Sequence, residues 1–328
     1  MVMLWLWLAA CGDRTTTPAD PASATLLSDD TAASPTGATA DTSSPSPTAD
    51  TATSGSTLPP HASAGCTAGL RPSSPYDVSI SSGGRTREAI VDLPATYDGT
   101  TPAPLVLNFH GAATTADMHR GYTDMHIAAN ARGWVSVHPQ GTNRTWDYLS
   151  DSADIRFATE LLDELEQVLC LDTRRVYATG LSNGGYFSYQ LACDLGPRIT
   201  AIAAVAGGDA TLGCNPGVVV PLLHIHGTAD LIVPYAGNLV LRSARQSVSG
   251  WADKVNACRD APTPGFSAGD VSCEVWSCSP TDEAALCTVD GGGHTWPGAY
   301  PIPTLGPTND DIDATASILD FFARWARP

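Results

Sequence analysis

Residues 174–195 read RRVYATGLSNGGYFSYQLACDL, and this stretch decides the fold. Its first part predicts a strand over residues 175–180, and its last part predicts a helix over residues 183–195. Between them GLSNG, residues 180–184, fits G-x-S-x-G, a sharp strand-to-helix turn that exposes a serine hydroxyl. The glycines let strand and helix approach, and the helix N-terminus favours the negative charge of an oxyanion. The stretch predicts Ser182 as a nucleophile; a purely structural turn is the alternative.

Outward from this turn, short apolar runs alternate with helical patterns, which predicts an α/β fold. The expected architecture is a doubly wound, mostly parallel sheet with helices on both faces, in one domain over residues 65–328. Strands are predicted over residues 76–81, 88–93, 104–110, 134–138, 175–180, 199–205 and 218–225, with a hairpin over 271–276 and 284–289. Helices are predicted over residues 118–132, 154–169, 183–195 and 312–325.

A nucleophilic serine needs a general base, usually histidine, that a carboxylate orients. In hydrolases with this turn the chain order is serine, acid, histidine. Three histidines follow Ser182. His294 lies in the glycine-rich loop GGGHTWPG, whereas His224 and His226 lie in or at the end of a predicted strand, where packed or turn roles are expected. His294 is the predicted base.

The acid is expected just past a late strand, between the serine and the base. Asp230 in HGTADLIVPY follows the strand that ends at residue 225. Asp209 is the competitor, because it lies on a glycine-rich loop, but that loop follows an earlier strand. We therefore predict Asp230.

The oxyanion of an acyl-transfer reaction needs two N–H donors. The turn itself offers the backbone N–H of Asn183. The second donor is expected in the loop after an early strand, where His110-Gly111-Ala112-Ala113 ends the run PLVLNFH. The N–H of Ala112 is the first candidate and that of Ala113 the second, with His110 bracing the loop.

Composition bounds the class of protein. The 328 residues include 34 acidic and 17 basic ones, a net charge of −17, and 43% hydrophobic residues, enough for a sizeable core. The charge argues against nucleic acid and against docking on anionic lipid through a basic patch. No CxxC pair stands near a histidine, so zinc is not expected. We expect no metal, no cofactor and no obligate protein partner.

The N-terminus predicts export. Residues 1–11, MVMLWLWLAAC, are an apolar run too short to span a bilayer. Leu8-Ala9-Ala10-Cys11 resembles the lipobox of bacterial lipoproteins, so Cys11 is the expected lipidation site; a plain secretory signal is the alternative. Residues 12–64 are mostly Ser, Thr, Ala and Pro, which predicts a disordered linker. The expected location is extracellular or at the cell surface, with membrane contact through a lipid anchor only.

Eight cysteines remain after Cys11, an even number compatible with four disulfides. Comparable lengths of the strand before Ser182 and the helix after it predict that the chain returns to its start, which pairs Cys170 with Cys193. The predicted hairpin places two cysteines opposite each other, and a third pair joins a helix end to it. The remaining pairs are therefore Cys273–Cys287, Cys258–Cys278 and, by elimination, Cys66–Cys214.

Six segments together resemble a known family: LPATYDG, PLVLNFHG, HPQG, RRVYATGLSNGG, HGTADLIVPY and GGGHTWPG. They are similar to the bacterial polyhydroxybutyrate depolymerase and feruloyl esterase group, related to the family-one carbohydrate esterases. The resemblance covers residues 66–326 and implies an α/β-hydrolase fold. Matched position by position, it implies the triad Ser182, Asp230 and His294, which agrees with the order argument. It also implies Ala112 and Asn183 as the oxyanion hole.

Two tryptophans are candidates for substrate contact. The resemblance implies that Trp296 flanks the substrate, with a loop anchor in the core as the alternative, and Trp146 after HPQG is a second candidate. The expected activity is hydrolysis of a carboxylic ester through an acyl-enzyme, with activity rising through about pH 6–7 as an imidazole loses its proton. Feruloyl or acetyl esters on xylan, polyhydroxybutyrate and short-chain esters all remain open as substrates. A serine peptidase and a non-catalytic surface-binding lipoprotein are the rival functions.

Overall fold

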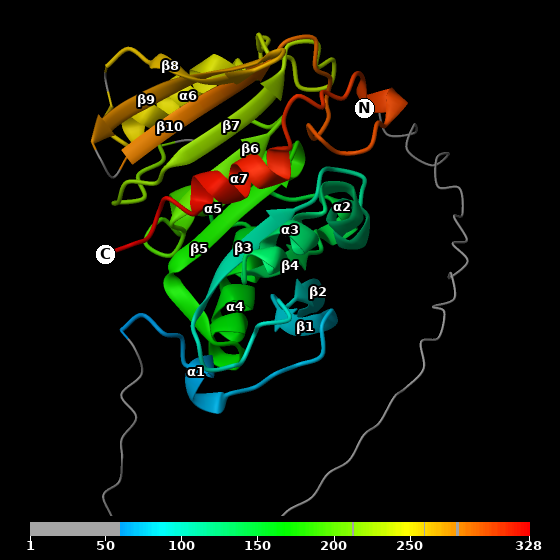
Figure 1. The fold of residues 1–328 in the computed structure, drawn as a ribbon, viewed down its shortest axis with the longest axis vertical. Coiled ribbons are helices and arrows are strands. Elements are labelled where there is room, and N and C mark those ends of the chain that lie inside the picture. The colour runs from blue at the N-terminus through cyan, green and yellow to red at the C-terminus, as the bar shows by residue number, and fades with distance from the viewer. Residues whose placement is uncertain (1–59, 212, 259, 280–281) are drawn as a thin grey trace, which may run out of the picture. The chain divides into compact units, whose positions relative to one another are not determined.

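A ten-stranded sheet forms the centre of the computed structural model, which describes residues 60–328 without 212, 259, 280 and 281 (Figure 1). The strand order is β1-β2-β4-β3-β5-β6-β7-β10-β9-β8. The strands are β1 (Tyr76–Ser82), β2 (Arg85–Asp92), β3 (Ala103–Phe109), β4 (Val135–Pro139), β5 (Leu171–Leu181), β6 (Ala201–Val205), β7 (Leu222–Gly227), β8 (Thr263–Ala268), β9 (Val271–Ser279) and β10 (Asp282–Val289).

The middle of the sheet is parallel, from β4 through β3, β5, β6 and β7 to β10. Antiparallel strands close both ends, with β1 and β2 at one and β9 and β8 at the other. Every residue of β3, β4, β6 and β7 is buried, as expected for strands covered on both faces. The predicted doubly wound α/β-hydrolase fold is therefore confirmed.

Helices cover the two faces of the sheet in separate groups (Figure 1). Successive strand residues point to opposite faces, so Leu105 and Leu107 pack in one core cluster and Val106 in the other. The first cluster includes residues of α4 (Ala153–Val168), α5 (Asn183–Asp194) and α6 (Ala244–Lys254). The second includes residues of α2 (Ala116–Thr123), α3 (Met125–Ala131) and α7 (Ala314–Phe322). The remaining short helices are α1 (Gly65–Ala68), η1 (Thr142–Arg144) and η2 (Pro303–Leu305).

The helix predicted over residues 118–132 is wrong in one respect, because it is two helices. Asp124 has a left-handed backbone, φ 48°, which ends α2 and starts α3. Sequence analysis also missed α6 and β8. The signal for α6 was present, since Ser243 and Gln246 form a capping box at its start.

Of the predicted disulfides, Cys273–Cys287 is confirmed across the β9–β10 hairpin. The Cys170–Cys193 and Cys66–Cys214 pairings are wrong. Strand β5 has 11 residues and rises by roughly 36 Å, whereas the 12 residues of α5 rise by only about 18 Å, so the helix end does not return to the start of the strand. The bonds formed are Cys66–Cys170 and Cys193–Cys214.

Some predictions fall outside what the structure describes. The side chain of Cys278 is not described, so the Cys258–Cys278 pair stays a prediction. The signal at residues 1–11, with Cys11, and residues 12–59 of the linker also lie outside. Within the described part of the chain, no helix has the length and apolar character needed to cross a bilayer.

Candidate active site

Ser182 occupies a strained turn between β5 and α5. Its backbone has φ 56° and ψ −117°, a conformation that non-glycine residues rarely adopt. The Ser182 N–H donates to the Val205 carbonyl at 2.8 Å, which ties the turn to β6. A Cβ at Gly180 would lie 2.5 Å from the Phe109 oxygen, and one at Gly184 would overlap the same carbonyl. Only glycine fits on either side, which is the physical reason for the G-x-S-x-G spacing.

The predicted acid and base meet in the structure. His294 Nδ1 and Asp230 Oδ2 are 2.7 Å apart, and both side chains are buried. Ser182, Asp230 and His294 follow β5, β7 and β10, which belong to one run of parallel strands, so all three lie at the carboxyl edge where ligands bind in such sheets. Among the described contacts the Ser182 hydroxyl forms no hydrogen bond with His294. Such bonds often tighten only when substrate is present.

Asp230 is held as a carboxylate. Its Oδ1 accepts the backbone N–H groups of Ile232 and Val233, each at 2.8 Å. Its Oδ2 lies 3.3 Å from His226 Nε2 as well as close to His294. Burial by itself raises the pKa of Asp230, but the hydrogen bonds from His226, His294 and Val233 outweigh it and keep that pKa well below its usual range.

Asp209, the competing acid, is engaged elsewhere. Its Oδ2 accepts a hydrogen bond from Arg242 at 2.8 Å, and its Oδ1 accepts the N–H and hydroxyl of Thr211. The structure thus brings His294 to Asp230 and not to Asp209.

The loop after β3 abuts Ser182. A Cβ built on Gly111 would lie 3.6 Å from the Ser182 Cβ. The N–H of Ala113, the second-choice donor, is committed to the Arg144 carbonyl at 2.8 Å. The N–H of Ala112 has no partner among the described residues, and that of Asn183 lies in the first turn of α5, where helical N–H groups have no intrahelical partner. These two N–H groups are free to donate hydrogen bonds to an oxyanion.

The curated relatives of the chain are esterases. It is 29% identical over 237 residues to feruloyl esterase B of Piromyces equi, a match that covers 63% of this chain and 42% of that protein. It is 26% identical over 279 residues to feruloyl esterase D of Neurospora crassa, covering 80% and 90%. No model of a known protein family matches the chain.

Solved structures give the fold. The acetyl xylan esterase from Aspergillus awamori superposes with a TM-score of 0.56 and 13% identity, covering 76% of this chain and 99% of that one. The chain has the α/β-hydrolase fold, and the relatives that it resembles are named for esterase activity. These likenesses support a carboxylic ester hydrolase. Within the described part of this hydrolase, no group of three or more His, Cys, Asp or Glu side chains could hold a metal ion.

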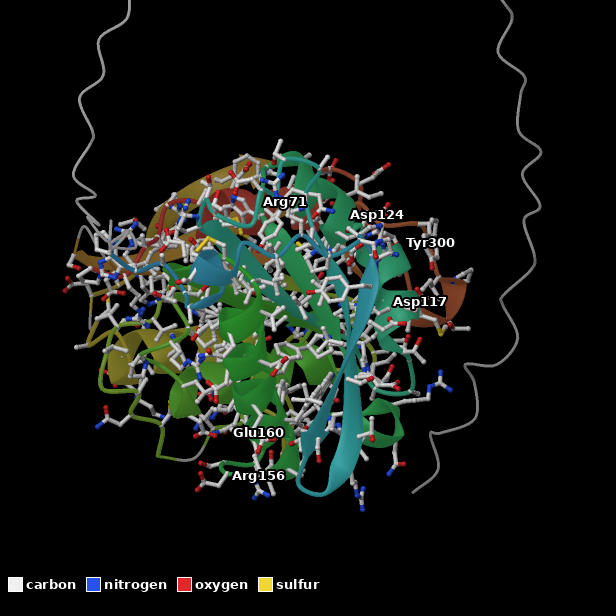
Figure 2. All side chains as sticks on the ribbon, turned by 90° about the horizontal axis from the view of Figure 1, so that it is seen from below. Arg71, Asp117, Asp124, Arg156, Glu160 and Tyr300 are labelled. Atoms are coloured by element: carbon white, nitrogen blue, oxygen red, sulfur yellow. A yellow bond between two sulfur atoms is a disulfide. The ribbon has the colours of Figure 1, made fainter. Side chains whose placement is uncertain are left out.

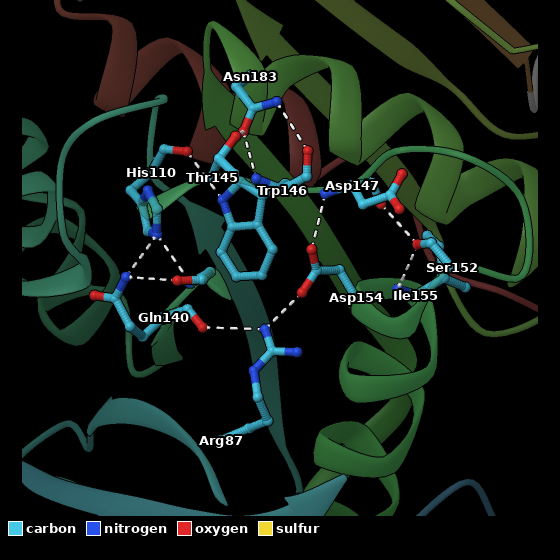
Figure 3. Close-up of polar contacts among 11 residues, drawn as sticks. Arg87, His110, Gln140, Thr145, Trp146, Asp147, Ser152, Asp154, Ile155 and Asn183 are labelled. Carbon is cyan, nitrogen blue, oxygen red and sulfur yellow. Dashed lines mark hydrogen bonds and ion pairs between the residues drawn. The ribbon is translucent and has the colours of Figure 1, made fainter. Parts of the chain in front are cut away.

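His110 braces the loop after β3, as predicted. Its Nδ1 donates to the Gly111 carbonyl at 2.8 Å. On the other side of the ring, its Nε2 accepts the Gly141 N–H at 2.9 Å, a contact drawn in Figure 3. Gln140 lies 3.2 Å from the same Nε2 and accepts the N–H of Ala116 at the start of α2. Burial lowers the pKa of His110 to about 4, so the ring is neutral at physiological pH. Sequence reasoning quoted HPQG without assigning a role to Gln140.

The Asn183 side chain locks the turn to the loop after β4. Its Oδ1 accepts the Trp146 N–H at 2.6 Å and the Thr145 hydroxyl at 3.1 Å, and its Nδ2 donates to the Trp146 carbonyl at 3.0 Å (Figure 3). Below it, Arg87 donates to Asp154 at 2.6 Å. Sequence reasoning missed these braces, because they join segments far apart along the chain.

Both tryptophans named as substrate candidates are buried. Trp146 is 2% exposed, stacks on Phe187 and donates its Nε1–H to the His110 carbonyl. Trp296 is 1% exposed and donates its Nε1–H to Thr315. In this structure both indoles anchor loops in the core. For Trp296 this is the alternative that the sequence left open beside substrate contact.

An exposed aromatic that sequence reasoning did not single out lies further along the loop of His294. Tyr300 is 58% exposed and packs edge-on against Tyr122 of α2, with ring centroids 5.1 Å apart (Figure 2). It therefore lies beside α2, the helix that follows the loop after β3. No pattern in GGGHTWPG itself pointed to it.

Proposed function

We propose that this protein hydrolyses carboxylic esters through an acyl-enzyme on Ser182, with His294 as base and Asp230 as the acid that orients it. One observation carries the proposal: the 2.7 Å hydrogen bond between His294 Nδ1 and Asp230 Oδ2 at the edge of the sheet where the strained Ser182 turn lies. This bond leaves His294 Nε2 as the nitrogen that takes a proton.

The reaction follows from these positions. Nε2 of His294 removes the hydroxyl proton as Oγ of Ser182 attacks the ester carbonyl, and the ionised Asp230 stabilises the resulting imidazolium. The N–H groups of Ala112 and Asn183 hold the oxyanion. His294 then protonates the departing alkoxide, and water repeats the cycle to release the acid and free Ser182.

For the substrate we propose an ester of a plant cell-wall polysaccharide, feruloyl or acetyl, because curated relatives are named as feruloyl esterases and as an acetylxylan esterase/xylanase. Polyhydroxybutyrate and short-chain esters are the alternatives. Three disulfides within the described residues fit a protein that folds outside the cytosol, and with the lipobox they support a lipid-anchored enzyme at the cell surface.

The test compares the full-length protein with Ser182→Ala on p-nitrophenyl acetate and butyrate. We expect Ser182→Ala to lower kcat by about 10⁴-fold or more while circular dichroism stays unchanged. Turnover that survives this substitution would mean that another group is the nucleophile. A folded wild type without esterase activity would favour the non-catalytic binding lipoprotein. A wild type that prefers a peptide anilide to the esters would favour the serine peptidase. Methyl ferulate, acetylated xylan and polyhydroxybutyrate then rank the substrates.

A further inference from the structure

Behind Asp230 lies a row of buried groups that the reaction described above does not use. The Tyr189 hydroxyl on α5 is 2.9 Å from His224 Nδ1, and His224 Nε2 is 3.0 Å from His226 Nδ1. His226 Nε2 lies 2.8 Å from the Val233 carbonyl and 3.3 Å from Asp230 Oδ2. Both histidines belong to β7 and are buried. The row thus runs from the helix behind the nucleophile to the proposed catalytic acid.

The direction of every hydrogen bond in the row follows from its last link. His226 Nε2 faces two acceptors, a carbonyl and a carboxylate, so it carries the proton. The 3.0 Å contact between the two rings is then a hydrogen bond from His224 Nε2 to His226 Nδ1. His224 Nδ1 is left to accept the hydroxyl proton of Tyr189. All donors therefore point toward Asp230, and bonds aligned in this way strengthen one another.

We propose that His226 is a positioning residue of the active site, a second imidazole that donates to Asp230 and sets how strongly that carboxylate holds the proton on His294. This inference rests on the proposed triad. Asp230 Oδ2 is shared between His294, at 2.7 Å, and His226, at 3.3 Å. His226 neither contacts the reacting atoms nor moves a proton in the reaction.

Other titratable groups around His226 are accounted for. The ring of Tyr235 stands edge-on to His226, with centroids 5.8 Å apart, and its hydroxyl bonds to Thr288. Burial keeps the pKa of His224 well below, and that of Tyr189 well above, its ordinary value, so both are neutral. Further groups in this region are Tyr186 on α5 and Asp209, which is paired with Arg242.

The proposal predicts the direction in which the pH profile of kcat/KM moves when His226 is replaced. A donor at Oδ2 draws negative charge from the carboxylate and weakens its attraction for the His294 proton. Without this donor the imidazolium is more stable. His294 therefore loses its proton at higher pH, and the acid limb of kcat/KM moves up.

The experiment measures kcat/KM on p-nitrophenyl butyrate from pH 5 to 9 for full-length His226→Phe and His226→Gln. Phenylalanine keeps a ring but removes the donor, so we expect kcat/KM to fall about 10- to 100-fold through kcat, and the acid limb to rise by roughly one pH unit. Glutamine keeps an N–H near Nε2 and is expected to restore activity to within about threefold. His138→Phe, at an equally buried histidine on β4, is the control and should leave the pH profile unchanged.

The outcomes separate this inference from the proposed function. A folded His226→Phe with the wild-type pH profile would overturn the positioning role, while loss of activity in Ser182→Ala would still uphold the esterase. If His226→Phe does not fold, the ¹⁵N shifts of histidine-labelled wild-type protein decide. Protons on Nε2 of both His224 and His226 support these hydrogen-bond directions; a His226 ring with a proton on Nδ1 and none on Nε2 overturns them.

Discussion

At the scale of single residues, the side chains proposed to carry out the reaction differ from those that hold the loops around them in place. Ser182 and His294 could be named as candidates from the sequence because the roles proposed for them need particular residue types in a particular chain order. Asp230 could be favoured over Asp209, but only the structure contains the reason, which is the Arg242 side chain that occupies Asp209. The bracing side chains of Gln140 and Asn183 are not marked by a residue type or a position in the chain order that sequence analysis could recognise.

Gly184, two residues after Ser182, is expected to tolerate no side chain. In Gly184→Ala the added methyl group meets the Phe109 carbonyl, which is backbone and cannot rotate away. We expect a loss of about 2 kcal/mol or more in the free energy of unfolding, measured by urea denaturation, and a fall in esterase activity. Gly121→Ala is the matched control in α2, since its Cβ meets nothing within 4 Å. An equal loss in both variants would contradict the steric explanation.

Asp282 at the start of β10 is expected to make stability depend on pH. Burial, and then repulsion from Glu283, raise the pKa of Asp282 to about 6, and its Oδ1 has no hydrogen-bond partner within the described chain. A carboxyl with a raised pKa in the folded state costs nothing at low pH and destabilises the protein as pH rises from about 4 to 6. Asp282→Asn should remove that loss and, with solvent screening of this carboxyl taken into account, be about 1 kcal/mol more stable than wild type at pH 7.5.

The check is urea unfolding of both proteins at pH 4 and pH 7.5. Wild type and Asp282→Asn should differ little at pH 4 and diverge at pH 7.5. Curves that stay parallel across this range would show that Asp282 is not the source of the dependence.

At the scale of secondary-structure elements, the strands that are buried on both faces were the ones that the sequence predicted well. The strands β3, β4, β6 and β7 are buried on both faces, so each appears in the chain as an apolar run. In contrast β8 is mostly exposed and has no such pattern. The break at Asp124 was missed, because apolar spacing continues through it and only a left-handed backbone separates α2 from α3.

At the scale of the whole molecule, disulfide pairing resisted prediction since it depends on how distant segments pack. The Cys66–Cys170 bond spans 104 residues, and Cys273–Cys287 spans 14. Longer loops lose more unfolded-state entropy when closed, so removing the first bond should cost about 1–2 kcal/mol more than removing the second. Thermal and urea unfolding of Cys66→Ala/Cys170→Ala beside Cys273→Ala/Cys287→Ala measure this. The reverse order would contradict the entropic argument.

The place of the Cys66–Cys170 bond has a mechanical consequence. Ser63 donates its N–H to the Leu171 carbonyl and accepts the Leu171 N–H at its hydroxyl, and Cys66 is bonded to the residue before β5. Tension applied to the chain on the N-terminal side of residue 60 is therefore transmitted to the start of β5, a central strand, and not to β1 at the edge of the sheet. A pull along the N-terminal segment would load the sheet through a covalent cross-link, and the β1–β2 hairpin would not be peeled away first.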